Sequence, residues 1–259
     1  VEILSIFTIT RCGGTSLSIW ICSRLNMVSF TPTELDALSL SLLVALWSIS
    51  VSLPLGIAAA WLLSRKSFPG KSIVDGLIHL PLVVPPVVVG YLLLILLGTQ
   101  GPIGGFLKDT FGITLIFTWK GAAVASAVMA FPLMVRAIRL SFDSVDRGLE
   151  EAAATLGASP TRVFLTITLP LVLPGVIVGM ILAFARSLGE FGATITFVSN
   201  IPGETQTLPL ALFTQTQTPG GDASAIRLVV FSVALALFAL IISEVISRRV
   251  ARHIAGPGS

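Results

Sequence analysis

Long apolar segments separated by short polar connectors dominate this sequence. Each is long enough to cross a bilayer, because about 20 apolar residues in a helix span the hydrocarbon core. The convincing segments are residues 37–63, 73–97, 121–140, 167–188 and 225–246. The pattern predicts an all-α integral membrane protein, a multi-span helical bundle with about five core transmembrane helices.

The N-terminal stretch is harder to interpret. Residues 1–9 are apolar but too short to span a membrane, and Arg11 and Arg24 interrupt the remainder of this stretch. Residues 1–30 are either a possible extra N-terminal helix or an extension upstream of the true start site. We favour a peripheral or loosely structured segment.

The second apolar segment contains prolines. Pro81, Pro85 and Pro86 remove backbone donors, so they kink or break the helix over 73–97. Such breaks survive in a bilayer where neighbouring helices or a water-filled path satisfy the freed carbonyls. The segment is therefore either a wall of a transport pathway or a kinked packing helix. His79, near its start, favours a structural hydrogen bond over a ligand contact.

Three further stretches have a distinctive composition. Residues 98–120 form a glycine-rich connector, and the segment 121–140 is rich in Ala and Ser, which allows helices to approach closely. Residues 191–224 contain few charges, and we expect re-entrant or surface helices there.

Composition supports the membrane assignment. Hydrophobic residues make up 54% and charged residues 11% of the chain, whereas soluble domains carry about 25% charged residues. No basic patch with interleaved aromatic residues is present, so nucleic acid is not an expected partner. Cys12 and Cys22 give neither a metal-binding spacing nor a disulfide framework. We expect no metal, no cofactor and no catalytic residues.

A polar helix pair lies between the third and fourth apolar segments. Leu149, Ala153 and Leu156 share one face of a short helix. Glu150 and Glu151 lie in its early turns, where acidic groups suit the helix dipole.

The second helix of the pair begins after a short turn. Gly157 is expected to end the first helix in a left-handed conformation. Ser159 followed by Pro160 indicates an N-cap and a first-turn proline. The pair, expected over residues 144–166, connects the two membrane segments on either side.

This stretch resembles the "EAA" signature of bacterial ABC-importer permeases. The resemblance implies a cytoplasmic coupling element that inserts into a groove on an ATP-hydrolysing partner subunit. The residues that match the signature, at its spacing, are Glu151, Ala152, Ala153, Gly157, Ile167, Leu169 and Pro170.

Further runs resemble the molybdate permeases of this class. They are residues 79–91, 131–139 and 183–205, and the resemblance extends from residue 36 to the end, leaving out 1–30. It implies the type I ABC importer permease fold. Permeases for sulfate and thiosulfate share much of the pattern. The residues do not separate molybdate from sulfate or tungstate, which are similar oxyanions.

The resemblance also implies partners and a location. They are a second permease copy in a homodimer, a pair of ABC ATPase subunits, a periplasmic molybdate-binding protein and the lipid bilayer of the bacterial inner membrane. Alternating access driven by ATP would then move the oxyanion. Two other classes stay open: a non-ABC membrane carrier, and a sensory or structural membrane subunit.

Basic residues predict the orientation. With the helix pair inside, the inner connectors hold more Lys and Arg than the outer ones, as cytoplasmic loops do. We therefore divide the chain into an N-terminal extension (1–33), a permease domain (34–247) and a cytoplasmic tail (248–259). The outer residues are Lys108, Lys120 and Arg227, and the inner ones are Arg65, Lys66, Lys71, Arg136, Arg139, Arg147, Arg162 and the tail arginines Arg248, Arg249 and Arg252.

Two further local patterns bear on function. Residues 69–72 resemble the end of a phosphate-binding loop, but the glycine required five residues before Gly70 is Arg65, so the match fails. Arg186 and Glu190 lie four residues apart near a membrane boundary. They form a gate, or an anion-steering arginine with its counter-charge, or a simple intrahelical pair. Together with Pro85 and Pro86 they are the candidate pathway residues.

Overall fold

The computed structural model describes residues 31–255, which are mostly helical and contain no strand within that range. The question of a helix within residues 1–30 lies outside the described residues. The helices are α2 (Pro32–Arg65), α3 (Lys71–Val83), α4 (Pro86–Leu97), α5 (Pro102–Phe111), α6 (Trp119–Ser144), α7 (Arg147–Thr155), α8 (Pro160–Val163), the π-helical turn η1 (Phe164–Thr168), α9 (Leu169–Leu188), α10 (Gly192–Val198), α11 (Leu208–Gln217) and α12 (Asp222–Ala255).

Four stretches of helix are long and apolar enough to cross a membrane. They are α2, α6, the continuous run Pro160–Leu188, and Asp222–Ile242 of α12. The all-helical, multi-span fold expected from the apolar segments is confirmed. α2 begins at Pro32, so the expected boundary between residues 33 and 34 falls in its first turn. At the other end, α12 runs into the expected tail as far as Ala255.

The remaining expected span is a broken helix. α3 and α4 are bent by 115° relative to each other, and together they make a fifth candidate span. The break lies at Val84 and Pro85, whose backbones are extended. A residue before proline avoids the helical region, and Pro86 then starts α4. Pro81 lies inside α3 without ending it, so only two of the three expected prolines are at the break.

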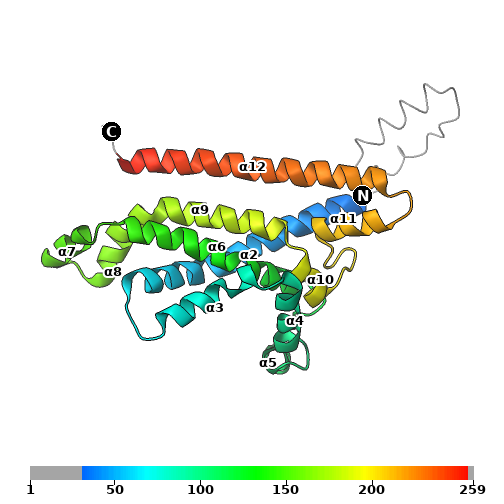
Figure 1. Cartoon of the computed structure of the whole chain (residues 1–259), viewed down its shortest axis with the longest axis horizontal. Coiled ribbons are helices and arrows are strands. Elements are labelled where there is room, and N and C mark those ends of the chain that lie inside the picture. The colour runs from blue at the N-terminus through cyan, green and yellow to red at the C-terminus, as the bar shows by residue number, and fades with distance from the viewer. Residues whose placement is uncertain (1–30, 256–259) are drawn as a thin grey trace, which may run out of the picture.

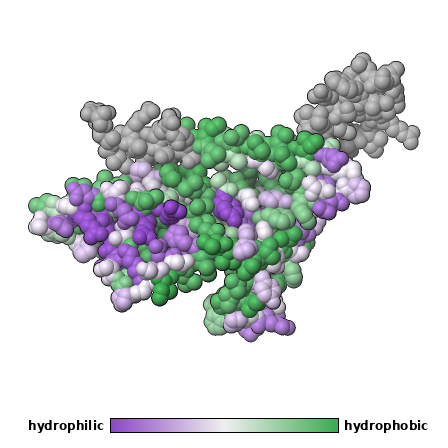
Figure 2. Space-filling model, in the orientation of Figure 1, coloured by the Kyte–Doolittle hydropathy of each residue, from purple (hydrophilic) through white to green (hydrophobic). Residues whose placement is uncertain are grey.

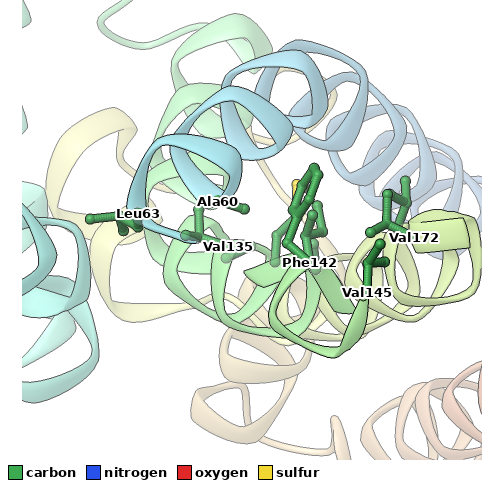
Figure 3. Close-up of a cluster of buried hydrophobic side chains, with 11 residues drawn as sticks. Ala60, Leu63, Val135, Phe142, Val145 and Val172 are labelled. Atoms are coloured by element: carbon green, nitrogen blue, oxygen red, sulfur yellow. The ribbon is translucent and has the colours of Figure 1, made fainter. Parts of the chain in front are cut away.

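α6 forms the centre of the bundle and packs between α2 and α9. Ala122, Ala125, Ser126 and Ala130 of α6 are buried, as the small-residue composition predicted. Gly175 provides close approach, since a Cβ there would lie 2.3 Å from Ser141 Cβ. Figure 3 shows the apolar cluster where these helices meet, which includes Ala60, Leu63, Val135, Phe142, Val145 and Val172.

α4 and α5 project from one side of this bundle, as Figure 1 shows. The only glycine of α4, Gly90, lies against α10, because a Cβ there would come within 2.6 Å of the Ala193 carbonyl oxygen. The glycine-rich connector over 98–120 has helical structure of its own. It contains the ten-residue helix α5 and the first two residues of α6, with Thr118 as the N-cap of α6.

The segment 191–224 holds two short helices, as expected. α10 is not a surface helix, because Ala193, Phe197 and Val198 are fully buried. α12 packs against α9 and α11 and runs along the length of the molecule in Figure 1. At the start of α2, Glu34 is buried and pairs with Arg227 of α12, with 2.8 Å between Glu34 Oε1 and Arg227 Nη2.

Candidate functional site

A protrusion made of α7 and α8 leaves the bundle between α6 and α9. Asp146 caps α7, since its Oδ1 accepts the Gly148 N–H at 2.9 Å. Gly157 has φ +84°, and the Ala158 and Gly157 amides bond to the carbonyls of Ala153 and Ala154, so the helix ends in a Schellman motif. The expected end of the first helix is confirmed.

The second helix of the protrusion also begins where expected. Ser159 holds the N-cap position with an extended backbone, and Pro160 opens α8. However, the Ser159 side chain makes no capping hydrogen bond. The fixed φ of the proline is what pre-organises this turn.

The tip of the protrusion exposes its apolar side chains. Leu149 is 50% exposed and Leu156 89% exposed, while Ala153 is half-buried against the rest of the chain. Glu151 is exposed beside them. α7 packs mainly against α8 and η1, and it lies at one end of the molecule in Figure 1. This apolar and acidic tip is therefore free to contact another protein.

Figure 2 shows hydrophilic residues gathered at the end of the molecule where α7 and α8 lie, whereas hydrophobic residues cover its middle. A cleft of about 800 Å³ separates the protrusion from the last turns of α2. Ile57, Trp61 and Phe164 give it an apolar wall, and charged residues line its rim. Lys66 lies over the Trp61 ring, with Nζ 5.5 Å from the ring centroid.

The two adjacent glutamates of α7 differ in their contacts. Glu151 is exposed, but Glu150 faces the bundle, where its Oε1 lies 2.9 Å from Arg65 Nη2. The same oxygen accepts a hydrogen bond from Thr168 Oγ1 at 2.7 Å. The sequence pattern predicts only a helix-dipole role for Glu150 and an inner-side charge for Arg65, so it does not reveal this contact.

The other signature residues lie where the protrusion rejoins the membrane helices. Ile167 belongs to η1, and Leu169 and Pro170 open α9. The Leu169 N–H bonds to the Phe164 carbonyl, five residues back, as a π-turn requires. Pro170 has no N–H to donate, which favours such an irregular turn. Phe164 also stacks on Phe142 of α6, with ring centroids 6.4 Å apart.

The candidate gate residues form a second cluster near the opposite end of α9. Arg186 Nη1 lies 2.6 Å from Glu190 Oε2, and the Glu190 side chain is 1% exposed. α9 ends at Leu188, so the pair is not simply intrahelical. Glu190 Oε1 accepts the Ala193 N–H at 2.8 Å and so ties the end of α9 to α10.

The proline break reaches the same cluster. A Cβ on Gly192 would lie 2.8 Å from Pro86 Cβ, so the start of α4 contacts the turn after Glu190. Pro85 itself is exposed. The fold therefore brings Pro86 into the same region as Arg186 and Glu190, which lie about 100 residues later in the sequence.

His79 is used structurally, as expected. Its Nδ1 lies 2.8 Å from the Asp75 carbonyl oxygen, one helical turn away. Asp75 also pairs with Arg139 of α6 at 3.0 Å. Among residues 31–255, no cluster of three or more His, Cys, Asp or Glu side chains has a metal-binding arrangement.

Known proteins resemble this chain in both sequence and fold. A family described as "Binding-protein-dependent transport system inner membrane component" matches residues 52–252. The molybdenum transport system permease protein ModB of Escherichia coli (strain K12) is 61% identical over 226 residues, which cover 87% of this chain and 98% of that protein. The ModB protein of Haemophilus influenzae is 59% identical over 221 residues, 85% of this chain and 96% of that protein.

More distant relatives include a sulfate transport system permease protein, CysW of Synechococcus elongatus, which is 34% identical over 84% of this chain and 76% of its own length. Among solved structures, a bacterial ABC transporter that imports alginate matches with a TM-score of 0.70 at 18% identity, over 89% of this chain and 84% of that chain. The methionine transporter MetNI matches with a TM-score of 0.63 at 16% identity, over 92% and 100%. These structural likenesses concern the fold.

Proposed function

Because this chain belongs to the family of binding-protein-dependent transport system inner membrane components, we infer that it is the permease subunit of an ATP-driven molybdate importer. The identity of 61% to a molybdenum permease, over 98% of that protein, carries this conclusion. The sulfate permease in the comparison is only 34% identical. Molybdate is therefore the proposed substrate, and tungstate, sulfate and thiosulfate are the alternatives that a competition experiment decides.

The protrusion is the proposed coupling element. Its tip exposes Leu149, Leu156 and Glu151 to contact with another protein. We propose that a pair of ABC ATPase subunits supplies a groove for this tip and hydrolyses the ATP. The signature residues act together here: Glu151, Ala152 and Ala153 meet the ATPase, Gly157 turns the chain, and Ile167, Leu169 and Pro170 connect it to α9.

A second copy of the chain and a periplasmic molybdate-binding protein complete the proposed assembly. The α4–α5 projection exposes Tyr91, Phe106 and Phe111, each by more than half. Aromatic side chains are enriched at protein interfaces, which supports contact with the second copy. The binding protein delivers the oxyanion to the outer side, and the permease pair forms the pathway.

We place the gate of this pathway at the contact between Pro86 and the Arg186–Glu190 pair. A charged pair within a membrane bundle usually faces a partner or a water-filled cavity. The Glu190 side chain of this pair is 1% exposed, whereas the Arg186 side chain is 25% exposed. The arginine is thus available to a passing dianion, and Pro85 and Pro86 let α4 move separately from α3.

The protrusion faces the cytoplasm in this proposal, and so does the C-terminus. The permease domain then comprises residues 34–247, with 144–166 as its coupling helices. The protein is a multi-pass protein of the inner membrane.

Reconstitution tests the whole proposal. The chain is placed in liposomes with its ABC ATPase pair and supplied with the matching binding protein, and uptake of labelled molybdate is followed. We expect uptake to require both ATP and the binding protein. We also expect unlabelled sulfate, at a concentration equal to that of molybdate, not to suppress this uptake. Uptake without ATP would indicate a non-ABC carrier, and absence of uptake a sensory or structural subunit. Stronger competition by sulfate would overturn the substrate assignment.

A further inference from the structure

One carboxylate oxygen joins three separate elements at the base of the protrusion. Glu150 Oε1 accepts from Arg65 Nη2 of α2 at 2.9 Å and from Thr168 Oγ1 of η1 at 2.7 Å. Arg65 and Glu150 are 85 positions apart in sequence. The contact therefore links α7 to α2, a helix that is distant from it in the sequence.

The surroundings make this contact strong. The side chain of Arg65 is 10% exposed, that of Glu150 is 23% exposed, and Thr168 is 2% exposed as a residue. Charges that are removed from water interact more strongly than exposed ones, because the effective dielectric constant is lower. A charged acceptor with two donors from different elements also fixes direction as well as distance.

The neighbouring glutamate gives a natural contrast. Glu151 lies one residue, or about 100° of helix rotation, from Glu150, and it is exposed on the protrusion. Within residues 31–255, the ion pair that holds α7 to α2 is made by Glu150 and not by Glu151. Glu151 belongs instead to the surface offered to another protein. The two glutamates thus face different sides of the same short helix.

α2 extends from this contact to the far end of the molecule. A helix of 34 residues is about 50 Å long. Its other end is held by the buried pair between Glu34 and Arg227 of α12, at 2.8 Å. A displacement of α7 would therefore act on the last turn of α2 through Arg65, and on the start of α9 through Thr168.

We propose that Glu150 is the positioning residue that transmits movement of the protrusion to the membrane helices, through Arg65 to α2 and through Thr168 to α9. This inference rests on the proposed transport function, since it names the residue that links ATP hydrolysis to the pathway. It assigns to Glu150 a role distinct from that of the signature glutamate: Glu151 contacts the ATPase, and Glu150 transmits the resulting displacement.

The first test compares Glu150→Gln with Glu151→Gln in the reconstituted complex. Glu150→Gln keeps the shape but loses the charge. We expect it to retain co-purification with the ATPase and ATP hydrolysis, but to lower molybdate taken up per ATP hydrolysed by about tenfold, within the range typical of coupling between two sites. Glu151→Gln is expected to weaken co-purification instead. A wild-type uptake ratio in Glu150→Gln would overturn the proposal.

A charge exchange separates transmission from simple folding. Arg65→Glu and Glu150→Arg are each expected to lower the molybdate taken up per ATP hydrolysed. The double variant is expected to recover at least half of the wild-type ratio, because the ion pair re-forms with reversed polarity. The Thr168 hydroxyl can accept a hydrogen bond as well as donate one, so its contact with position 150 is kept. If both single variants assemble normally but the double variant recovers nothing, the pair does not transmit movement.

Amide hydrogen exchange in the same complexes tests the contact between Glu150 and Arg65 independently of transport. We expect Glu150→Gln to speed amide exchange in α7 and in the last turn of α2 together, and Glu151→Gln to leave the α2 turn unchanged. Equal amide exchange rates in the last turn of α2 for the two variants would contradict a link between α7 and α2 through Glu150. A wild-type complex without ATP-driven uptake would instead overturn the proposed function, and the exchange result would still stand.

Discussion

At the scale of single residues, neighbouring side chains with the same chemistry perform different tasks. Glu150 and Glu151 are adjacent and equally charged, yet one is held by Arg65 and Thr168 and the other is exposed. The helix rotation of about 100° per residue separates them onto different faces. An exposed carboxylate has little effect on the stability of its own chain, so a change there acts through the partner.

Glu151→Lys is expected to abolish uptake without preventing membrane insertion. The substitution reverses the charge on the exposed tip, and like charges placed across an interface lose affinity. Uptake of labelled molybdate and the amount of chain in the membrane fraction are measured together. The matched control is Glu204→Lys, since Glu204 is also exposed but lies in the loop between α10 and α11. Normal uptake by Glu151→Lys would count against the coupling role.

At the scale of elements, glycine positions decide how helices turn and how closely they pack. Gly157 ends α7 with a positive φ, and nothing lies within 4 Å of a Cβ placed there. Gly175 is the opposite case, since a Cβ there would overlap Ser141 of α6. One glycine is therefore required by backbone conformation and the other by space, and the two requirements predict different mutant behaviour.

Gly157→Val should insert into the membrane but fail to transport. A β-branched residue at φ +84° is strained by about 1–3 kcal/mol, which shifts the angle between α7 and α8. Gly157→Asn serves as the control, because Asn tolerates the left-handed conformation. We measure uptake for both variants. Equal effects of Val and Asn at this position would show that backbone strain is not the cause.

Gly175→Ala should lower stability, although alanine is the better helix former. The added Cβ would lie 2.3 Å from Ser141 Cβ, and such overpacking costs about 1–3 kcal/mol. Gly76→Ala in α3 is the matched control: its Cβ meets nothing within 4 Å, so about 0.8–1.0 kcal/mol of helix propensity is gained. Thermal midpoints in detergent are compared. Adding Ser141→Gly is expected to restore the thermal midpoint of the Gly175→Ala variant. Equal midpoints for Gly175→Ala and Gly76→Ala would refute the close approach of α9 to α6 at Gly175.

At the scale of the whole molecule, the face drawn in Figure 2 has many hydrophilic residues towards the end where α7 and α8 lie, and hydrophobic residues over much of the rest. Glu–Arg pairs hold α2 near both ends: the buried Glu34 pairs with Arg227 of α12, and Arg65 pairs with the partly buried Glu150 of α7. The protrusion lies at one end of this arrangement. Because Lys and Arg collect on the side of the protrusion, that side is expected in the cytoplasm.

Cysteine labelling tests this orientation. Leu156→Cys, at a position 89% exposed, is expected to react with a membrane-impermeant maleimide only in inverted vesicles. Glu204→Cys is expected to react only from the outside of intact cells. Both changes are made in a chain whose Cys12 and Cys22 are serine. Labelling of Leu156→Cys in intact cells would reverse the orientation and remove the coupling role.

Much of this protein follows from local sequence. Apolar segment length predicted the membrane helices, because the bilayer imposes a minimum number of residues on each crossing. Gly157 and Pro160 predicted where the two helices of the protrusion end and begin, because their backbone preferences are intrinsic. Proline also predicted a break in the second span, and the spacing of the EAA signature predicted the family.

Tertiary structure decided the contacts between distant residues. No local pattern relates Arg65 to Glu150, Glu34 to Arg227 or Pro86 to the turn after Glu190, since each pair meets only after the helices have packed. The burial of α10 was also set by packing, because Ala193, Phe197 and Val198 lie in an apolar cluster formed with α4 and α6. Spacing along the chain identifies elements, but which of two adjacent glutamates faces the bundle depends on where the neighbouring helices lie.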